Sequence, residues 1–184
     1  MAIRARLDEG SETLTLHHPE LATLTFQPDA AADVSRFLGW VAPVMPEGRA
    51  ASTGIIRAKD QGLTDSSSPS ISLGNLATLR ALEQMAGQPL DTRRFRINLW
   101  VEGLAPYEEL EWLDKTIRIG AVKFQVRDHP ITRCTSTMAN PETGRRDADP
   151  LAVMEANWGH QDLGLTIIAQ DSGEVATGDQ VELV

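Results

Sequence analysis

The chain has 184 residues, a length that suits one domain, or one and a half, better than two full domains. Lys and Arg total 17 against 26 Asp and Glu, and the resulting net charge of −9 argues against non-specific nucleic-acid binding. A single cysteine, Cys134, excludes a disulfide within the chain and zinc or iron–sulfur sites built from several cysteines. The sequence has no apolar run near the roughly 20 residues of a membrane span and no hydrophobic signal core in its first residues, which predicts a cytoplasmic protein.

The first third of the chain carries one hairpin signal and one helix signal. Residues 12–16 and 21–26 alternate apolar and polar side chains around a His-His-Pro-Glu turn, which predicts a β-hairpin. Residues 29–40 favour a short helix. Residues 41–70 are rich in Pro, Gly and Ser, and we expect them to form a long irregular connection.

The clearest helix signal follows Ser72, which is a candidate N-cap. Gly87 and the nearby Pro89 predict where this helix stops. An apolar stripe at helical spacing marks the face that packs on the core: Leu76, Leu79, Leu82 and Ala86.

Beyond Gly87 the pattern changes to short β-branched strands separated by turn residues, with one more short helix at residues 149–157. The turn signals are Gly120, Pro130, Asn140-Pro141, Gly173 and Gly178-Asp179. The predicted strands are residues 94–101, 116–119, 122–127, 131–137, 164–170 and 179–184. Many short strands and few helices predict a mainly β fold of the α+β class, a β-barrel with peripheral helices.

Residues 94–101 have a strict period of two and lie in a basic segment, since residues 93–146 hold ten of the 17 Lys and Arg residues. One predicted face carries Phe95, Ile97, Leu99 and Val101, and the other carries Arg94, Arg96, Asn98 and Trp100. If the polar face lines a cleft, its two guanidinium groups and one amide form an anion site. If it faces bulk solvent, it is an ordinary exposed strand surface.

Cys134 follows Arg133 in a run of hydroxyl-bearing residues. A lone cysteine is most often a small buried hydrophobic residue. A cationic neighbour lowers the pKa of a thiol, however, and a thiolate is a nucleophile and a soft metal ligand. His129 lies five residues upstream, but no Asp or Asn is placed to complete a Cys–His hydrolase site, so that interpretation is weak.

Over residues 60–184 an ordered set of short motifs resembles the MOSC domain, a family named for the C-terminal domain of molybdenum cofactor sulfurases. The resemblance is stronger to the branch that holds the mitochondrial amidoxime reducing component and its bacterial relatives. The matching residues are Leu63-Thr64-Asp65, Ser70-Ile71-Ser72, Arg94-Phe95-Arg96-Ile97-Asn98, Glu109 before Trp112, Ile119-Gly120, Arg133-Cys134, Asn140-Pro141-Glu142-Thr143-Gly144 and Gly178-Asp179.

The resemblance implies a MOSC β-barrel over residues 61–184, preceded by a shortened N-terminal subdomain over residues 1–60. It implies that the protein binds molybdenum cofactor (molybdopterin), and the family is also associated with pyridoxal phosphate binding. Cys134 then supplies the thiolate to molybdenum and is the catalytic residue. The resemblance implies cofactor contacts for Ser72, Arg96, Asn98 and Thr132, with Arg94 and Arg133 in support.

Two features depart from the family. Ile97 stands where relatives usually have Pro, a change that a strand tolerates. A Pro-Ile-Lys-Ser type motif, whose Lys and Ser help to hold the cofactor in relatives, does not occur. We expect either a short family member or a chain truncated relative to a longer product, with a sheet edge whose exposure favours dimerisation.

Three hypotheses for the function follow. The leading one is a molybdenum-dependent oxidoreductase component that reduces small N-hydroxylated substrates, receives electrons from a separate haem or flavin protein, and contacts neither nucleic acid nor membrane. The sequence has no Gly-rich dinucleotide-binding motif that opens a helix after a strand, so a reductase of this kind would need a separate electron donor. The second is a sulfur-carrier or cofactor-handling module in which Cys134 carries a persulfide. The third is a non-catalytic anion-binding barrel with Cys134 as an inert core residue.

Overall fold

A computed structural model describes residues 2–57 and 68–184, so the Leu63-Thr64-Asp65 motif lies outside the described residues. The chain divides into two compact units. The first comprises Met1–Gln61 and Pro141–Arg145, and the second comprises Gly62–Asn140 and Arg146–Val184.

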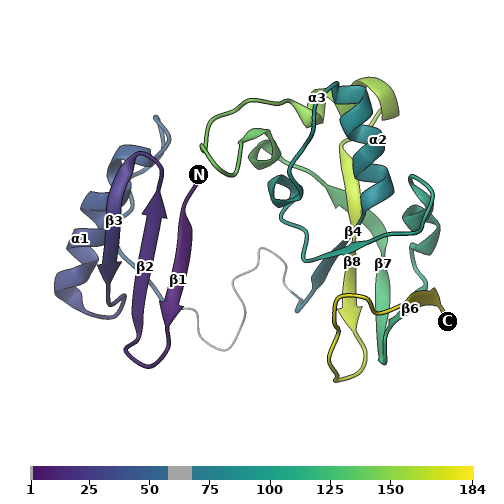
Figure 1. Ribbon diagram of the computed structural model, residues 1–184, viewed down its shortest axis with the longest axis horizontal. Coiled ribbons are helices and arrows are strands. Elements are labelled where there is room, and N and C mark those ends of the chain that lie inside the picture. The colour runs from purple at the N-terminus through teal and green to yellow at the C-terminus, as the bar shows by residue number, and fades with distance from the viewer. Residues whose placement is uncertain (1, 58–67) are drawn as a thin grey trace. The chain divides into compact units, whose positions relative to one another are not determined.

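The first unit is an antiparallel three-stranded sheet with one helix (Figure 1). Its strands are β1 (Arg4–Asp8), β2 (Thr13–His18) and β3 (Leu21–Phe26), and its helix is α1 (Ala31–Val41), followed by the 3₁₀ turn η1 (Ala42–Val44). The predicted hairpin and helix are confirmed. The strand β1 was not predicted: Ala5 and Leu7 alternate with polar residues, but the run is short and all five residues of the strand are exposed.

A small core holds the first unit together. Leu16, Leu24 and Phe26 are buried beneath α1, and the Phe26 ring stacks on that of Phe37 with centroids 5.3 Å apart. The segment Pro141–Arg145 is attached to this unit by ion pairs of Glu142 with Arg4 and of Arg145 with Glu20, the latter at 2.7 Å.

The second unit is built on a curled six-stranded sheet, which confirms the predicted mainly β, α+β fold (Figure 1). The strand order is β5-β4-β8-β7-β6-β9. The strands are β4 (Ile71–Asn75), β5 (Leu99–Val101), β6 (Thr116–Ile119), β7 (Val122–Thr132), β8 (Asp162–Ala169) and β9 (Val181–Leu183). Among the described strands of this sheet, only β4 and β5 pair in parallel, with the helix α2 (Leu76–Ala86) in the connection between them, and the remaining neighbours are antiparallel.

The helix ends have local causes. The Asn75 side chain caps α2 by accepting a hydrogen bond from the backbone of Ala77, and Gly87 ends that helix in the left-handed conformation. The prediction of Ser72 as the cap is wrong: Ser72 lies inside β4, and the helix begins four residues later. The short helix predicted at residues 149–157 is confirmed as α3 (Pro150–Trp158), capped by Asp149.

Two predicted strands are wrong where they approach the site. Residues 94–101 do not form one strand: η2 (Thr92–Phe95) is a 3₁₀ turn, Arg96 has a φ of 52°, and pairing with β4 starts only at Leu99. Residues 131–137 are not a strand either, because β7 ends at Thr132 and a 3₁₀ turn, η4 (Thr135–Met138), follows. Pro130 lies within β7 at a register shift, so its prediction as a turn residue is wrong. Between β5 and β6 the chain forms a further 3₁₀ turn, η3 (Glu108–Trp112).

Two hydrophobic clusters form the core of the second unit. The larger lines the inside of the curled sheet and includes Phe124, Leu165 and Ile167, each at most 2% exposed. The smaller joins α2 and α3 to the sheet through residues such as Leu82 and Met154. In the described part of the chain, no helix has the length and apolar character needed to cross a bilayer.

Candidate functional site

Cys134 lies between β7 and η4 and is exposed, so the hypothesis of an inert core cysteine is wrong. Its Sγ is 3.1 Å from the hydroxyl of Ser136. Its carbonyl accepts hydrogen bonds from the backbone and hydroxyl of Thr137, at 3.1 and 2.9 Å. Because these bonds fix the backbone on the C-terminal side of Cys134, the thiol is presented from an ordered turn.

Arg133 joins this turn to two other segments. Its Nε donates to the carbonyl of Leu163 at 2.6 Å, and its Nη1 donates to the carbonyl of Phe95 at 2.7 Å. Its Nη2 is buried with no hydrogen-bond partner in the described structure. Burial lowers the pKa of Arg133 to about 10, while the charges of Cys134 and Asp162 oppose that shift. Arg133 therefore carries a desolvated positive charge next to the thiol, with one donor unused.

Space for this guanidinium depends on Gly164, in β8. Gly164 has a φ of +88°, and a Cβ atom there would lie 2.8 Å from the carbonyl oxygen of Leu73 and 3.0 Å from Nη2 of Arg133. A residue without a side chain lets β8 approach both groups.

Ser72 and Asn98 form a reciprocal pair where β4 meets the segment before β5. The Ser72 backbone and hydroxyl donate to Oδ1 of Asn98 at 2.9 and 2.8 Å, and the Asn98 backbone donates to the Ser72 hydroxyl at 3.0 Å. With Oδ1 used in this way, the two amide hydrogens of Asn98 have no acceptor among the described residues. The pair thus presents hydrogen-bond donors at an exposed position.

Arg96 is exposed, and its guanidinium makes no ion pair or hydrogen bond within the described ranges. Its positive φ follows directly after Phe95, whose carbonyl is held by Arg133. The structure therefore brings the Arg96 backbone close to Arg133, and Ser72 close to Asn98. Arg96 is available to an external anion.

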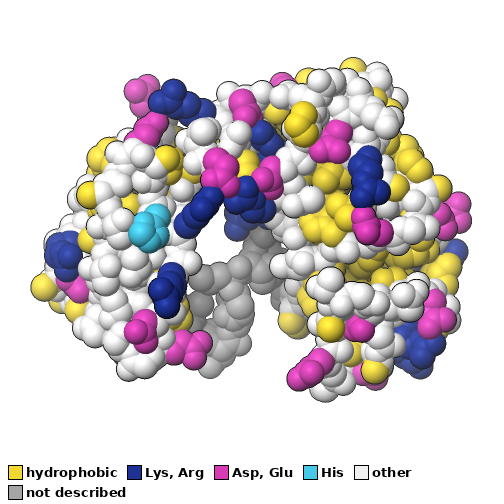
Figure 2. All heavy atoms as spheres, viewed as in Figure 1, with side chains coloured by type: hydrophobic (Ala, Val, Ile, Leu, Met, Phe, Trp, Pro, Cys, Tyr) yellow, Lys and Arg dark blue, Asp and Glu magenta, His cyan; other side chains and the backbone are white. Residues whose placement is uncertain are grey.

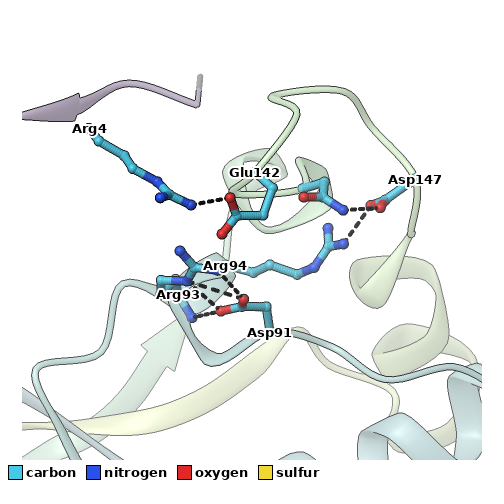
Figure 3. Close-up of polar contacts among 7 residues, drawn as sticks. Arg4, Asp91, Arg93, Arg94, Glu142 and Asp147 are labelled. Atoms are coloured by element: carbon cyan, nitrogen blue, oxygen red, sulfur yellow. Dashed lines mark hydrogen bonds and ion pairs between the residues drawn. The ribbon is translucent and has the colours of Figure 1, made fainter. Parts of the chain in front are cut away.

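Arg94 behaves differently from Arg96, because its side chain is only 5% exposed and is engaged within the unit (Figure 3). Its Nη2 pairs with Oδ1 of Asp147 at 2.6 Å, and its Nη1 donates to the carbonyl of Met138 at 3.1 Å. Asn140 donates to the other Asp147 oxygen at 2.6 Å. These bonds hold the pKa of Asp147 below its usual value, with the Asn140 bond as the largest cause. We call Arg94, Met138, Asn140 and Asp147 the arginine clamp; it holds the turn that follows Cys134.

Thr132 is exposed at the end of β7, and its hydroxyl donates to Asp162 at 2.5 Å. No hydrogen bond in the described structure joins Thr132 to Ser72, Arg96 or Asn98. Thr132 therefore neighbours Cys134 along the chain but does not belong to the Ser72–Asn98 pair.

Two polar groups that organise this unit are not apparent from the sequence. The residues around Asp147 are those of a solvated charged loop. Nothing in the sequence links Asp147 to its ion-pair partner Arg94, which is 53 residues away. Glu109 is buried, 1% exposed, and accepts bonds from Asn75 at 2.8 Å and from Thr78 at 2.7 Å. Its match to the family motif is the only clue, and its contacts are those of a structural residue.

For a metal ion, the candidate site offers Cys134 as a soft ligand. No group of three or more His, Cys, Asp or Glu side chains able to hold a metal ion occurs in the described ranges. A metal bound at Cys134 would therefore take its other ligands from a cofactor or from solvent.

Three features define the class of protein. They are a curled, mainly β sheet, an exposed turn at Arg133-Cys134, and the segment that holds Arg96 and Asn98. The MOSC domain model matches residues 65–182, and the chain belongs to the MOSC domain family. The resemblance seen in the sequence is thereby confirmed at family level.

Curated relatives match over shorter segments. The chain is 41% identical over 66 residues to a protein of Anopheles gambiae named molybdenum cofactor sulfurase, covering 36% of this chain and 8% of that protein. It is 38% identical over 84 residues to the protein of that name from Drosophila grimshawi, covering 45% of this chain and 10% of that protein. The matches thus span about a tenth of the length of these relatives.

Proposed function

We propose that this MOSC protein binds molybdenum cofactor and that Cys134 supplies the protein's thiolate to the metal. The carrying observation is an exposed Cys134 on an ordered turn beside a half-buried Arg133 with an unused donor. The names of the curated relatives, molybdenum cofactor sulfurase, support a link to this cofactor.

The residues fit such a group. One thiolate suffices where the cofactor brings two further sulfurs, and a pterin with a phosphate needs cationic forks and amide donors. Arg96 would hold the anion, and Asn98, oriented by Ser72, would donate to the pterin edge. Arg133 would balance negative charge at the thiolate. Arg94 would act indirectly, by holding the turn after Cys134, and Thr132 would line the approach to that turn.

The proposed reaction is removal of oxygen from a small N-hydroxylated substrate. When bound, the cofactor supplies a two-electron redox centre. Reduction of the N–O bond consumes two electrons and two protons and releases water. The electrons would come from a separate haem or flavin protein, and the residues around Cys134 would orient the substrate and hold the local positive charge.

Metal analysis tests the proposal. We expect molybdenum to copurify with the full chain expressed with cofactor supply, and the metal-to-protein ratio to fall about tenfold or more in Cys134→Ala. Arg96→Ala should also lower the ratio, whereas the matched Arg93→Ala, which removes an exposed arginine paired with Asp91, should not. Folded wild-type protein without molybdenum, or an unchanged ratio in Cys134→Ala, would contradict the proposal.

The relatives' name favours one second candidate, a sulfur-carrier module. In this role the Cys134 thiolate would attack the persulfide sulfur of a cysteine desulfurase, forming a Cys134 persulfide and releasing the desulfurase thiol. Mass spectrometry should then show an adduct of about 32 Da that dithiothreitol removes and that is absent from Cys134→Ser. If a standard thiol reagent modifies Cys134 rapidly but the desulfurase forms no adduct on it, this role is ruled out.

If neither molybdenum nor sulfur binds, the remaining hypothesis is a non-catalytic anion-binding barrel. Titration with inorganic phosphate and with pyridoxal phosphate, comparing wild type with Arg96→Ala, tests it directly. Binding that weakens in the variant would support this role, and no binding to the wild type would exclude it.

A further inference from the structure

The two outer strands of the sheet in the first unit, β3 and β1, differ in how their edges are protected. Two side chains of α1 donate to carbonyls of β3: Nη2 of Arg36 reaches Thr25 at 3.2 Å, and Nε1 of Trp40 reaches Ala22 at 2.5 Å. All five residues of β1, in contrast, are exposed. No hydrogen bond within the described residues reaches the β1 backbone from the side away from β2. An uncovered strand edge of this kind is a template for pairing with another strand.

One face of β1 extends the apolar surface of the unit beyond its helix. Ala5 and Leu7 lie directly opposite Leu16 and Leu14 of β2, so they belong to the same face as the buried core under α1. The helix packs mainly against β3, and Leu7 remains 57% exposed. A further strand beside β1 would remove this side chain from water.

The other face of β1 carries charges of both signs, because Arg4, Arg6 and Asp8 follow one another at every second position. Figure 2 shows basic side chains over β1 and acidic side chains beside the turn that follows it. Arg4 pairs with Glu142, whereas the Arg6 guanidinium makes no ion pair or hydrogen bond within the described ranges. Oδ1 of Asp8 accepts two backbone bonds from the turn, and its Oδ2 has no partner among the described residues.

These charges select both a partner and a register. Two antiparallel copies of β1 related by a two-fold axis at Leu7 place Arg6 of each copy opposite Asp8 of the other. The two Leu7 side chains then face each other on the apolar side. An axis at Arg4, Arg6 or Asp8 would set that charge opposite its own copy, and an axis at Ala5 would set Arg4 opposite Arg6. Like charges directly opposite destabilise a strand pair, so only the axis at Leu7 avoids them.

We propose that β1 is a dimerisation edge, which joins the three-stranded sheets of two copies of this chain into one continuous sheet. Leu7 packs on its symmetry mate, on the face that carries both α1 helices, and Arg6 pairs with Asp8 twice on the other face. One strand pair is a small interface, so the dimer is reversible and depends on concentration. It is independent of cofactor binding, because none of these residues contributes to the Cys134 site.

Charge reversal tests the register on the full chain, in a reducing buffer that prevents disulfides through Cys134. Analytical ultracentrifugation over a concentration series should show a monomer–dimer equilibrium for the wild type. Arg6→Glu and Asp8→Lys each set like charges opposite at both contacts, and each should weaken the dimer at least about tenfold. An equimolar mixture of the two variants should recover the wild-type affinity within about threefold, because every contact then joins an acid to a base. Arg49→Glu, at an exposed arginine outside the sheet, should leave the affinity unchanged.

Cross-linking tests the axis and leaves Arg6 and Asp8 in place. In a Cys134→Ser background, Leu7→Cys puts two thiols on the axis within reach of a disulfide, whereas Ala5→Cys puts them roughly 14 Å apart. Mild oxidation should therefore cross-link Leu7→Cys at least about tenfold faster, while thermal unfolding confirms that each variant is folded.

Three results would overturn the proposal. The first is a wild type that stays monomeric up to about 0.5 mM, which includes the case in which a different partner covers β1. The second is a pair of single charge reversals that dimerise as the wild type does. The third is equal cross-linking rates for Leu7→Cys and Ala5→Cys.

Discussion

Replacing Gly164 with Ala tests the account of how Arg133 is accommodated. Gly164 interrupts the regular pairing of β8 with β7, between the register partners Pro130↔Leu165 and Thr132↔Asp162. Its φ of +88° disfavours a side chain, and its position leaves no room for one beside Leu73 and Arg133.

The cost has two separable parts. A non-glycine residue in the left-handed region costs roughly 1–2 kcal/mol. Forcing a methyl group to 2.8 Å from a backbone carbonyl adds an overpacking cost of about 1–3 kcal/mol. Gly159 has a φ of +74°, and an alanine methyl group there would meet no atom within 4 Å. It shares only the first cost, so Gly159→Ala is the matched control.

Urea unfolding followed by tryptophan emission measures the difference. Trp100, Trp112 and Trp158 lie in the second unit, so emission reports mainly on that unit. We expect the free energy of unfolding to fall about 1–3 kcal/mol further in Gly164→Ala than in Gly159→Ala, which at a typical slope moves the midpoint by roughly 1 M urea. Equal losses in the two variants would show that the contacts around Gly164 yield without cost and would refute the reasoning.

Three further predictions concern stability. Glu109→Ala removes the acceptor of buried hydrogen bonds and should cost about 3 kcal/mol or more in urea unfolding, whereas the exposed Glu111→Ala should change stability by about 0.5 kcal/mol or less; equal effects would contradict a structural role for Glu109. The lowered pKa of Asp147 means that its contribution is complete above about pH 4 and is lost as pH falls through the folded-state pKa. The wild type should therefore lose more stability than Asp147→Asn between pH 7 and pH 3, and parallel losses would contradict the clamp. Phe124→Ala should cost about 3–5 kcal/mol in the same assay, and a loss below about 1 kcal/mol would refute its place in the core.

The mainly β fold was predictable from short β-branched segments separated by turn residues, and β6 and the first half of β7 also bury alternate residues. β6 shows this directly, with Ile117 and Ile119 buried and their neighbours less so. The failures cluster where tertiary contacts decide the backbone. Arg94 and Phe95 alternate as a strand would, yet the bond from Arg133 to the Phe95 carbonyl and the contact of Arg94 with Met138 accompany a 3₁₀ turn instead.

The site was predictable in residue identity but not in arrangement. The motif containing Arg96, Asn98 and Cys134 indicated which side chains to consider. That Arg94 turns inward while Arg96 remains exposed depends on Asp147, whose partner is 53 residues away, and on a positive φ at Arg96 that local sequence does not encode. Long-range pairing of this kind leaves no periodic signal in a single sequence.

The position of β8 also has a consequence for how the second unit comes to be folded. β8 lies between β4 and β7, so among the described strands the β4–β5 pair and the β7–β6–β9 group are joined by backbone pairing only through it. β4 is separated from its β8 partner by about 90 residues of chain, and such distant pairing is slow because the chain entropy of closing the loop is lost before the contacts form. During synthesis the apolar edges of β4 and β7 therefore wait, unpaired, until residues 162–169 emerge, and this interval is when the nascent protein is most exposed to aggregation.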